Sequence, residues 1–303
     1  MLSSTNSISC TAAQRNNSSS RKLAVITGAT SGIGKAYAEH FAAREYDLLI
    51  TGRRQKLIHR VAADLKNCYP VHIDVVIADL SKDGDLSQLL QILAKQKNIE
   101  VLVNNAGFGM DSRFSEDELD HQMAMLKVHV DAPVRLIKKV LPVMMENRKG
   151  IIINVSSLAA YTPTASNAMY TGTKSFLKNF TESLHLDVMN YGIKVQCLCP
   201  GFTRTDFHRN HNRSGDAGEY GTVNWMNPSE VVNYSMDCLN RGQVICIPGA
   251  LNRLTRSLIT VIPRSVYYFV SNRIEKKIRK PQHLPDFAFM KAFHQWSDRK
   301  SLF

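Results

Sequence analysis

The sequence predicts an α/β domain in which helices cover both faces of a parallel sheet. Between residues 23 and 250, short apolar runs rich in β-branched residues alternate with longer stretches of helical periodicity. Segments that alternate in this way typically form parallel strands joined by helices. Runs such as "KVQCLC" (194–199) are nearly continuous in apolar residues, as expected for strands that are buried on both faces.

The individual elements follow from these two patterns. The runs that we interpret as strands, about seven, are Leu23–Thr27, Asp47–Thr51, Val71–Ile77, Glu100–Val103, Gly150–Val155, Ile193–Cys199 and Gln243–Ile247. The helical segments are Gly34–Glu45, Arg54–Lys66, Leu86–Lys97, Leu119–Asn147, Ala168–Asn190 and Pro228–Leu239. Residues Arg204–Thr222 are polar and contain glycine, so we expect a mobile loop there.

The pattern changes after Ala250. Apolar residues recur at helical spacing from Leu251 to Ile262, and the segment "RSVYYFVSNRIEKKIRK" (264–280) is apolar first and cationic last. Two short amphipathic helices are expected. The chain thus divides into a disordered tail (1–22), an α/β domain (23–250) and an amphipathic helical extension with a basic tail (251–303).

The formal net charge of +12 is unevenly distributed. Residues 23–250 carry 24 basic and 23 acidic residues, whereas residues 251–303 carry 11 basic and three acidic ones, a net charge of +8. A nucleic-acid-binding domain would show a basic face across the fold, so we expect no nucleic-acid partner. A cationic end beside apolar helices favours peripheral contact with an anionic membrane surface. The alternatives are a solvated basic tail and helices that merely pack on the domain or on a partner subunit.

Composition also bears on the compartment. No apolar run reaches the roughly 18 residues of a membrane span, and the first 22 residues lack the apolar core of a signal peptide. An organelle presequence is an alternative for this basic, serine-rich leader. The six cysteines include no C-x-x-C pair, so we expect no metal site. A reduced, cytoplasmic protein fits best, with membrane contact through the extension as a further hypothesis.

The stretch "VITGATSGIG" (25–34) is a glycine-rich turn between a strand and a helix. Gly28, Gly32 and Gly34 let a ligand approach the backbone, and the helix N-terminus offers free N–H groups. This arrangement predicts a pyrophosphate site, with a plain tight turn as the alternative.

The end of the second strand indicates which dinucleotide binds. A free ribose 2′-hydroxyl usually meets an acid about 20 residues after the glycine turn. Here "TGRRQ" (51–55) places Gly52 at that point, followed by Arg53 and Arg54. Because guanidinium groups bind phosphate well, the pattern favours NADP(H), with Arg53 as the first candidate. The alternative is that both arginines merely open a helix.

Tyr170 and Lys174 are four residues apart, so on a helix they share one face. Lowering the tyrosine pKa from 10 to about 7 requires roughly 4 kcal/mol. A cation about 4 Å away, at an effective dielectric constant near 20, supplies roughly that amount. Burial opposes the shift. The pair therefore predicts an acid/base tyrosine assisted by a lysine.

Together these motifs resemble the short-chain dehydrogenase/reductase family in its single-domain, Rossmann-like form, over about residues 23–250. T-G-x-x-x-G-I-G is Thr27–Gly34, N-N-A-G is Asn104–Gly107, and Y-x-x-x-K is Tyr170–Lys174. The family's serine falls on Ser157, 13 residues before Tyr170. The cofactor-binding residues that the resemblance and the motifs imply are Gly28, Thr30, Ser31, Gly32, Ile33, Gly34, Arg53, Asp79, Asn105, Ala106, Gly107, Tyr170, Lys174, Pro200, Gly201, Phe202 and Thr205.

The resemblance also implies roles for the catalytic residues. Ser157 and Tyr170 would hydrogen-bond a substrate carbonyl, Tyr170 would transfer the proton, and Lys174 would contact the nicotinamide ribose. His129 stands where the family usually has an asparagine that holds a water. It could continue a proton relay, be a satisfied core residue, or mark weakened catalysis.

The resulting prediction is an NADP(H)-dependent carbonyl reductase or alcohol dehydrogenase. "SGIGKAYAEHFA" and "NNAGFG" look similar to the branch of 17β-hydroxysteroid dehydrogenases and 3-ketoacyl reductases, which suggests a hydrophobic substrate. The family also implies a homodimer or tetramer formed through the two long helices. One alternative function is a catalytically impaired NADP(H)-binding sensor or scaffold, and another is a nucleic-acid- or membrane-binding module carried by the cationic ends. The loop Arg204–Thr222 is placed to fold over the substrate.

Overall fold

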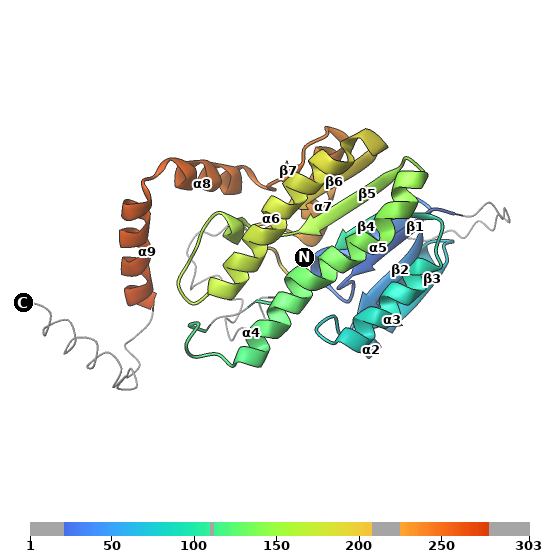
Figure 1. Ribbon diagram of the computed structural model, residues 1–303, viewed down its shortest axis with the longest axis horizontal. Coiled ribbons are helices and arrows are strands. Elements are labelled where there is room, and N and C mark those ends of the chain that lie inside the picture. Colours follow the sequence, from blue (N-terminus) through green and yellow to red (C-terminus); the bar gives the residue numbers. More distant parts are fainter. Residues whose placement is uncertain (1–20, 110–111, 208–224, 279–303) are drawn as a thin grey trace, which may run out of the picture. The chain divides into compact units, whose positions relative to one another are not determined.

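The protein is seen in a computed structural model that describes residues 21–109, 112–207 and 225–278. In this part of the chain, seven parallel strands form one sheet in the order β3-β2-β1-β4-β5-β6-β7 (Figure 1). The strands are β1 (Leu23–Thr27), β2 (Asp47–Gly52), β3 (Ile73–Ile77), β4 (Ile99–Asn104), β5 (Gly150–Val155), β6 (Ile193–Leu198) and β7 (Ile245–Cys246). The predicted doubly wound α/β fold is confirmed.

Helices pack on both faces of the sheet (Figure 1). One face carries α1 (Gly32–Ala42), α2 (Gln55–Cys68) and α7 (Pro228–Asn240), and the other carries α3 (Asp83–Ala94), α5 (Ala132–Glu146) and α6 (Ala168–Val188). In β1, Ala24 and Ile26 pack into the first layer, whereas Leu23 and Val25 pack into the second. Successive strand residues point to opposite faces, which is why the strands are apolar almost throughout.

Several predicted elements differ in their bounds; for example, α3 is Asp83–Ala94 instead of Leu86–Lys97, and β7 is Ile245–Cys246 instead of Gln243–Ile247. Two further differences have a local cause. The predicted helix Leu119–Asn147 is interrupted, because a π-helical turn (Lys127–Asp131) separates α4 (Leu119–Leu126) from α5. The predicted strand Val71–Ile77 starts two residues late, because the Val71 N–H bonds the Tyr69 carbonyl in a turn instead of the sheet ladder. Both corrections concern element ends or local winding, and the layer arrangement is unaffected.

The predicted C-terminal helices are present as α8 (Ala250–Val261) and α9 (Arg264–Ile278). Residues up to Thr260 form one compact unit and residues from Val261 a second. The predicted division at Ala250 stays a prediction. Among the described residues, no helix is long and apolar enough to traverse a bilayer. The predicted N-terminal tail up to residue 20, loop residues 208–222 and the tail from residue 279 lie outside the described residues.

Candidate active site

The glycine-rich turn after β1 has a backbone that suits a pyrophosphate. Gly28 and Gly32 have φ angles of 67° and 59°, in the left-handed region that glycine adopts readily. A Cβ atom on Gly34 would lie 2.4 Å from the Gly28 carbonyl oxygen. The N-cap residue of α1, Ser31, makes no side-chain cap, so the first-turn N–H groups are left for a ligand.

Residues at the end of β4 hold this turn in place. The Thr27 hydroxyl accepts hydrogen bonds from the N–H groups of Asn105 and Ala106, each at 3.0 Å. The Asn105 side-chain amide donates to the carbonyl oxygens of Thr27 and Gly28, also at 3.0 Å. The predicted residues Asn105 and Ala106 thus meet the glycine turn. Thr27 is not among the predicted site residues, although its place immediately before Gly28 is the signal that could have identified it.

Arg54 contacts the glycine turn more directly than Arg53 does. Its Nη2 donates to the Thr30 and Ser31 hydroxyls at 2.6 and 2.7 Å, and its Nη1 lies 3.2 Å from the Asp206 carboxylate. Arg53 is exposed, and its charge acts on Asp79. A guanidinium group that converges with two hydroxyls has the donors that bind a phosphate, so Arg54 is the stronger candidate.

Gly52 and Asp79 lie at the ends of the neighbouring strands β2 and β3. A Cβ atom on Gly52 would lie 2.7 Å from Thr30 Cγ2, so an acid at this position would collide with the glycine turn. The Asp79 carboxylate accepts hydrogen bonds from the Ser81 hydroxyl and N–H at 2.7 and 3.1 Å. Burial raises the pKa of Asp79, but these hydrogen bonds and the Arg53 charge outweigh it and lower the pKa below its usual range.

Ser157, Tyr170 and Lys174 converge at the carboxyl end of β5. Ser157 caps a 3₁₀ turn (Leu158–Ala160), and its side chain hydrogen-bonds Tyr170. The ammonium group of buried Lys174 donates to the Val155 carbonyl oxygen at 2.9 Å and lies 5.7 Å from the centre of the Tyr170 ring. The structure therefore brings together the three residues that the sequence motifs selected.

The electrostatics of this trio differ from expectation. Burial raises the pKa of Tyr170 above 10, against the lowering effect of the hydrogen bond with Ser157. Burial also lowers the pKa of Lys174 to about 8. The predicted lowering of the Tyr170 pKa toward 7 by Lys174 is not seen in the chain alone, where burial dominates. Tyr170 is therefore a neutral phenol at pH 7, the form that donates a proton.

His129 lies buried in the π-helical turn and ties two parts of the site together. Its Nε2 accepts from the Phe108 N–H at 3.1 Å, and its Nδ1 lies 3.0 Å from the Thr173 hydroxyl, which donates to the Tyr170 carbonyl oxygen. We assign the proton to Nδ1 from this network. Burial, with the Lys174 charge, holds the pKa of His129 well below 6.5. The ring is thus neutral and fully hydrogen-bonded.

The remaining predicted residues lie beside His129 and in the segment after β6. A Cβ atom on Gly107 would lie 2.8 Å from His129 Nε2, so this glycine lets the histidine approach. After β6, the Pro200 carbonyl accepts from the Leu158 N–H, and the Phe202 ring lies 5.3 Å from that of Trp225. Gly201 abuts the Asn252 amide, and a Cβ on Gly32 would lie 2.7 Å from Thr205 Cγ2. The segment Pro200–Thr205 therefore reaches from β6 to the glycine turn.

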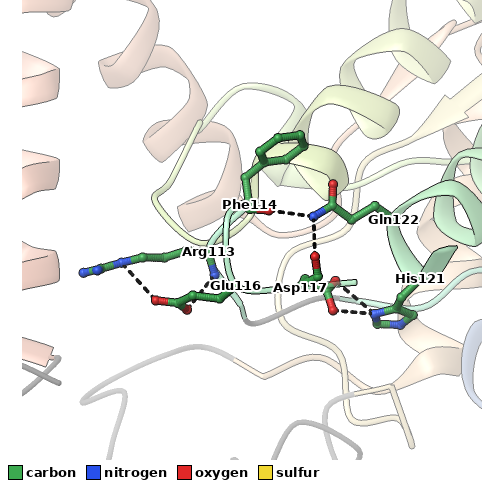
Figure 2. Close-up of polar contacts among 6 residues, drawn as sticks. All are labelled: Arg113, Phe114, Glu116, Asp117, His121 and Gln122. Atoms are coloured by element: carbon green, nitrogen blue, oxygen red, sulfur yellow. Dashed lines mark hydrogen bonds and ion pairs between the residues drawn. The ribbon is translucent and has the colours of Figure 1, made fainter. Parts of the chain in front are cut away.

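A polar cluster organises the segment between β4 and α4 (Figure 2). The Gln122 amide donates to the carbonyl oxygens of Phe114 and Asp117 at 2.8 and 3.3 Å, and the His121 ring pairs with the Asp117 carboxylate at 3.0 Å. The Phe114 side chain is exposed. It lines a small cavity together with Met169, the residue that precedes Tyr170 in the sequence. This segment is thus a candidate wall for a substrate.

Comparison with known proteins decides the family. The model of the short chain dehydrogenase family matches residues 22–215. The chain belongs to this family. A short-chain dehydrogenase from Sphingobium yanoikuyae, solved in complex with NADPH, has the same fold with a TM-score of 0.70 and 27% identity. The comparison covers 80% of this chain and 97% of that one.

Curated short-chain dehydrogenase relatives match a similar region. A human protein named inactive hydroxysteroid dehydrogenase-like protein 1 is 33% identical over 186 residues, which are 61% of this chain and 56% of that protein. The very-long-chain 3-oxoacyl-CoA reductase of Anas platyrhynchos is also 33% identical over 186 residues, 60% of each chain. The matches thus span little more than half the length of these relatives. Their names agree with the predicted likeness to the hydroxysteroid and 3-ketoacyl reductase branch.

Proposed function

We propose that this short-chain dehydrogenase interconverts a carbonyl compound and an alcohol with NADP(H), and that Tyr170 is its acid/base. The observation that carries the proposal is the convergence of Ser157, Tyr170 and Lys174 next to the glycine turn. In this arrangement Tyr170 hydrogen-bonds a hydroxyl and lies 5.7 Å from an ammonium group, measured from the ring centre. A phenol in this setting is suited to protonate a substrate oxygen.

The residues around the site fit a phosphorylated dinucleotide. The glycine turn has no room for side chains at Gly28 or Gly34, and α1 presents its N-terminus to the turn. Arg54, Thr30 and Ser31 would hold the 2′-phosphate, and the Gly52 position leaves no space for the acid that binds a free hydroxyl. The bound cofactor would supply the hydride. The NADPH complex of the Sphingobium relative supports the choice.

The residues of this chain then have distinct tasks. Ser157 and Tyr170 donate hydrogen bonds to the carbonyl oxygen, where negative charge develops during reduction. Tyr170 passes its proton to that oxygen, and Lys174 stabilises the phenolate that is left. With a pKa of about 8, Lys174 is mostly protonated at pH 7 and can take this role. His129 has both ring nitrogens occupied, so we assign it a positioning role.

We propose a hydrophobic substrate, such as a 3-ketoacyl chain or a steroid. The exposed aromatic ring of Phe114 beside the site and the name of the Anas relative support this class. The second candidate function is an NADP(H)-binding sensor or scaffold, because the human relative is named inactive. The intact trio of Ser157, Tyr170 and Lys174 favours the enzyme.

We also propose a cytoplasmic homodimer or tetramer that is formed through α5 and α6. On α6 the side chains of Phe176 and Leu186 are 41% and 68% exposed, which suits an interface between copies. Size-exclusion chromatography with light scattering tests this proposal, and a monomer at all concentrations would contradict it.

A panel of ketones and alcohols, scored by NADPH absorbance with NADH as the control, tests the proposed activity. We expect turnover of at least one bulky apolar ketone with NADPH in excess of that with NADH. A fluorescence titration of NADPH on the same sample separates the two candidate functions. Binding without turnover across the panel would favour the sensor, and absence of binding would remove both.

A further inference from the structure

Helix α8 carries a row of leucines that the domain does not cover. Leu251, Leu254 and Leu258 are 51%, 54% and 55% exposed. Their spacing of three and four residues places them on one face of the helix. Single exposed leucines are ordinary on a protein surface, but a contiguous apolar row on an ordered helix indicates an interaction surface.

Polar side chains hold α8 on the domain. The Asn252 side chain lies against Gly201, and Arg253 donates to the Tyr234 hydroxyl at 2.7 Å. The Arg256 guanidinium lies 5.5 Å from the centre of the Tyr161 ring, a cation–π contact. The helix is therefore fixed without its leucines, and the leucine row remains available to a partner.

The following helix, taken by itself, has the same character. In α9 the side chains of Val266, Phe269 and Val270 are 50%, 60% and 47% exposed. The Arg273 guanidinium lies 4.9 Å from the Phe269 ring centre. Long cationic side chains that cover apolar or aromatic groups are typical of helices at a membrane interface, where the charge can reach the headgroups.

The positive charge of α8 and α9 favours an anionic partner. The sequence of α8 and α9 contains six basic residues and one acid, Glu275, within a C-terminal region of net charge +8. A second copy of this helix would bring the same positive charge to the contact and be repelled. An anionic bilayer offers both an apolar interior for leucines and negative headgroups for arginines.

We propose that the leucine row of α8 (Leu251, Leu254 and Leu258) rests in the surface of an anionic lipid bilayer. The helix lies in the interface plane and its leucines reach the acyl boundary, while the net positive charge of the C-terminal region attracts the anionic surface. This docking does not depend on the proposed activity.

Vesicle co-sedimentation of the full-length chain tests the proposal. The probes are phosphatidylcholine vesicles with and without phosphatidylglycerol, at low and high salt. We expect binding to the anionic vesicles only, weakened by salt. Replacing all three leucines by glutamine should lower the partition coefficient on the order of a hundredfold, because three half-exposed leucines lose their lipid contact. The matched control is Leu57→Gln on α2, which is 39% exposed, lies outside both the leucine row and the proposed oligomer interface, and should bind like the parent.

Thermal melting and NADPH titration check that the variants fold, and the single variant Leu254→Gln provides a milder change with a drop of about fivefold. Three results would overturn the proposal. They are absence of binding to anionic vesicles, equal binding by the triple variant, and conversion of an oligomer to a monomer by the triple variant. The last outcome would assign the row to a second copy.

Discussion

Arg54→Ala is predicted to abolish the preference for the phosphorylated cofactor. Arg54 meets the Thr30 and Ser31 hydroxyls on the glycine turn, where we propose that the 2′-phosphate binds. Hydrogen bonds to a charged group contribute about 1.5–3 kcal/mol each. Loss of one such bond weakens NADPH binding on the order of 10- to 150-fold, and NADH, which lacks the phosphate, should bind nearly as before.

Replacing Asp206 is a second test of the same site, with the opposite expected effect on NADPH affinity. Its carboxylate lies 3.2 Å from Arg54 Nη1, and the two side chains are 37% and 39% exposed. An ion pair this exposed is worth at most about 1 kcal/mol. If the phosphate displaces Asp206, then Asp206→Asn should tighten NADPH binding by no more than about fivefold.

The assay for both variants is a fluorescence titration with NADPH and with NADH at fixed ionic strength. Arg53→Ala is the matched control, because it removes the same charge one residue away and its side chain is exposed. The reasoning is refuted if Arg54→Ala weakens both cofactors equally or leaves NADPH unchanged. It is also refuted if Arg53→Ala has the larger effect.

Three further predictions concern other parts of the site. Gly52→Asp should lower the melting temperature and weaken both cofactors instead of switching preference to NADH, because its Cβ would lie 2.7 Å from Thr30 Cγ2; tighter NADH binding would contradict this. Lys174→Met should slow ketone reduction at pH 7 on the order of a hundredfold, because Lys174, with a pKa of about 8, is protonated there and its charge, 5.7 Å from the ring centre, is worth about 3 kcal/mol to the phenolate at an effective dielectric constant near 20; an unchanged rate would argue against the lysine. The pKa of His129 is depressed in the folded chain, so below about pH 6.5 only the unfolded chain binds the proton and the stability that neutral His129 contributes is lost. The melting temperature of His129→Gln should therefore fall less than that of the parent between pH 7 and pH 5. An equal fall in melting temperature for both proteins would count against this.

The sequence patterns were sufficient to predict the sheet. β1 and β5 have the predicted ends, because a strand buried on both faces is a continuous apolar run bounded by turn or charged residues. The π-helical turn at His129 was not predictable in this way. The apolar periodicity continues across it, and the extra residue in the turn is set by contacts of His129 with Phe108 and Thr173.

The candidate site was likewise predictable from the sequence only in part. Motif spacing selected Ser157, Tyr170 and Lys174, because residues four apart on a helix share a face. It could not give the sign of the Tyr170 pKa shift, which depends on how deeply the phenol is buried. The proposal of Arg54 in place of Arg53 depended on a helix end. α2 begins at Gln55, one residue later than predicted, and Arg54 as its N-cap residue extends toward the glycine turn.

The central claim is that Tyr170 delivers the proton to a carbonyl beside the cofactor. Single-turnover oxidation of bound NADPH by a ketone substrate, compared between the parent and Tyr170→Phe, tests it most directly. We predict that the phenylalanine variant binds NADPH with unchanged affinity and oxidises it on the order of 10²- to 10⁴-fold more slowly. Equal rates in the two proteins would show that another group supplies the proton.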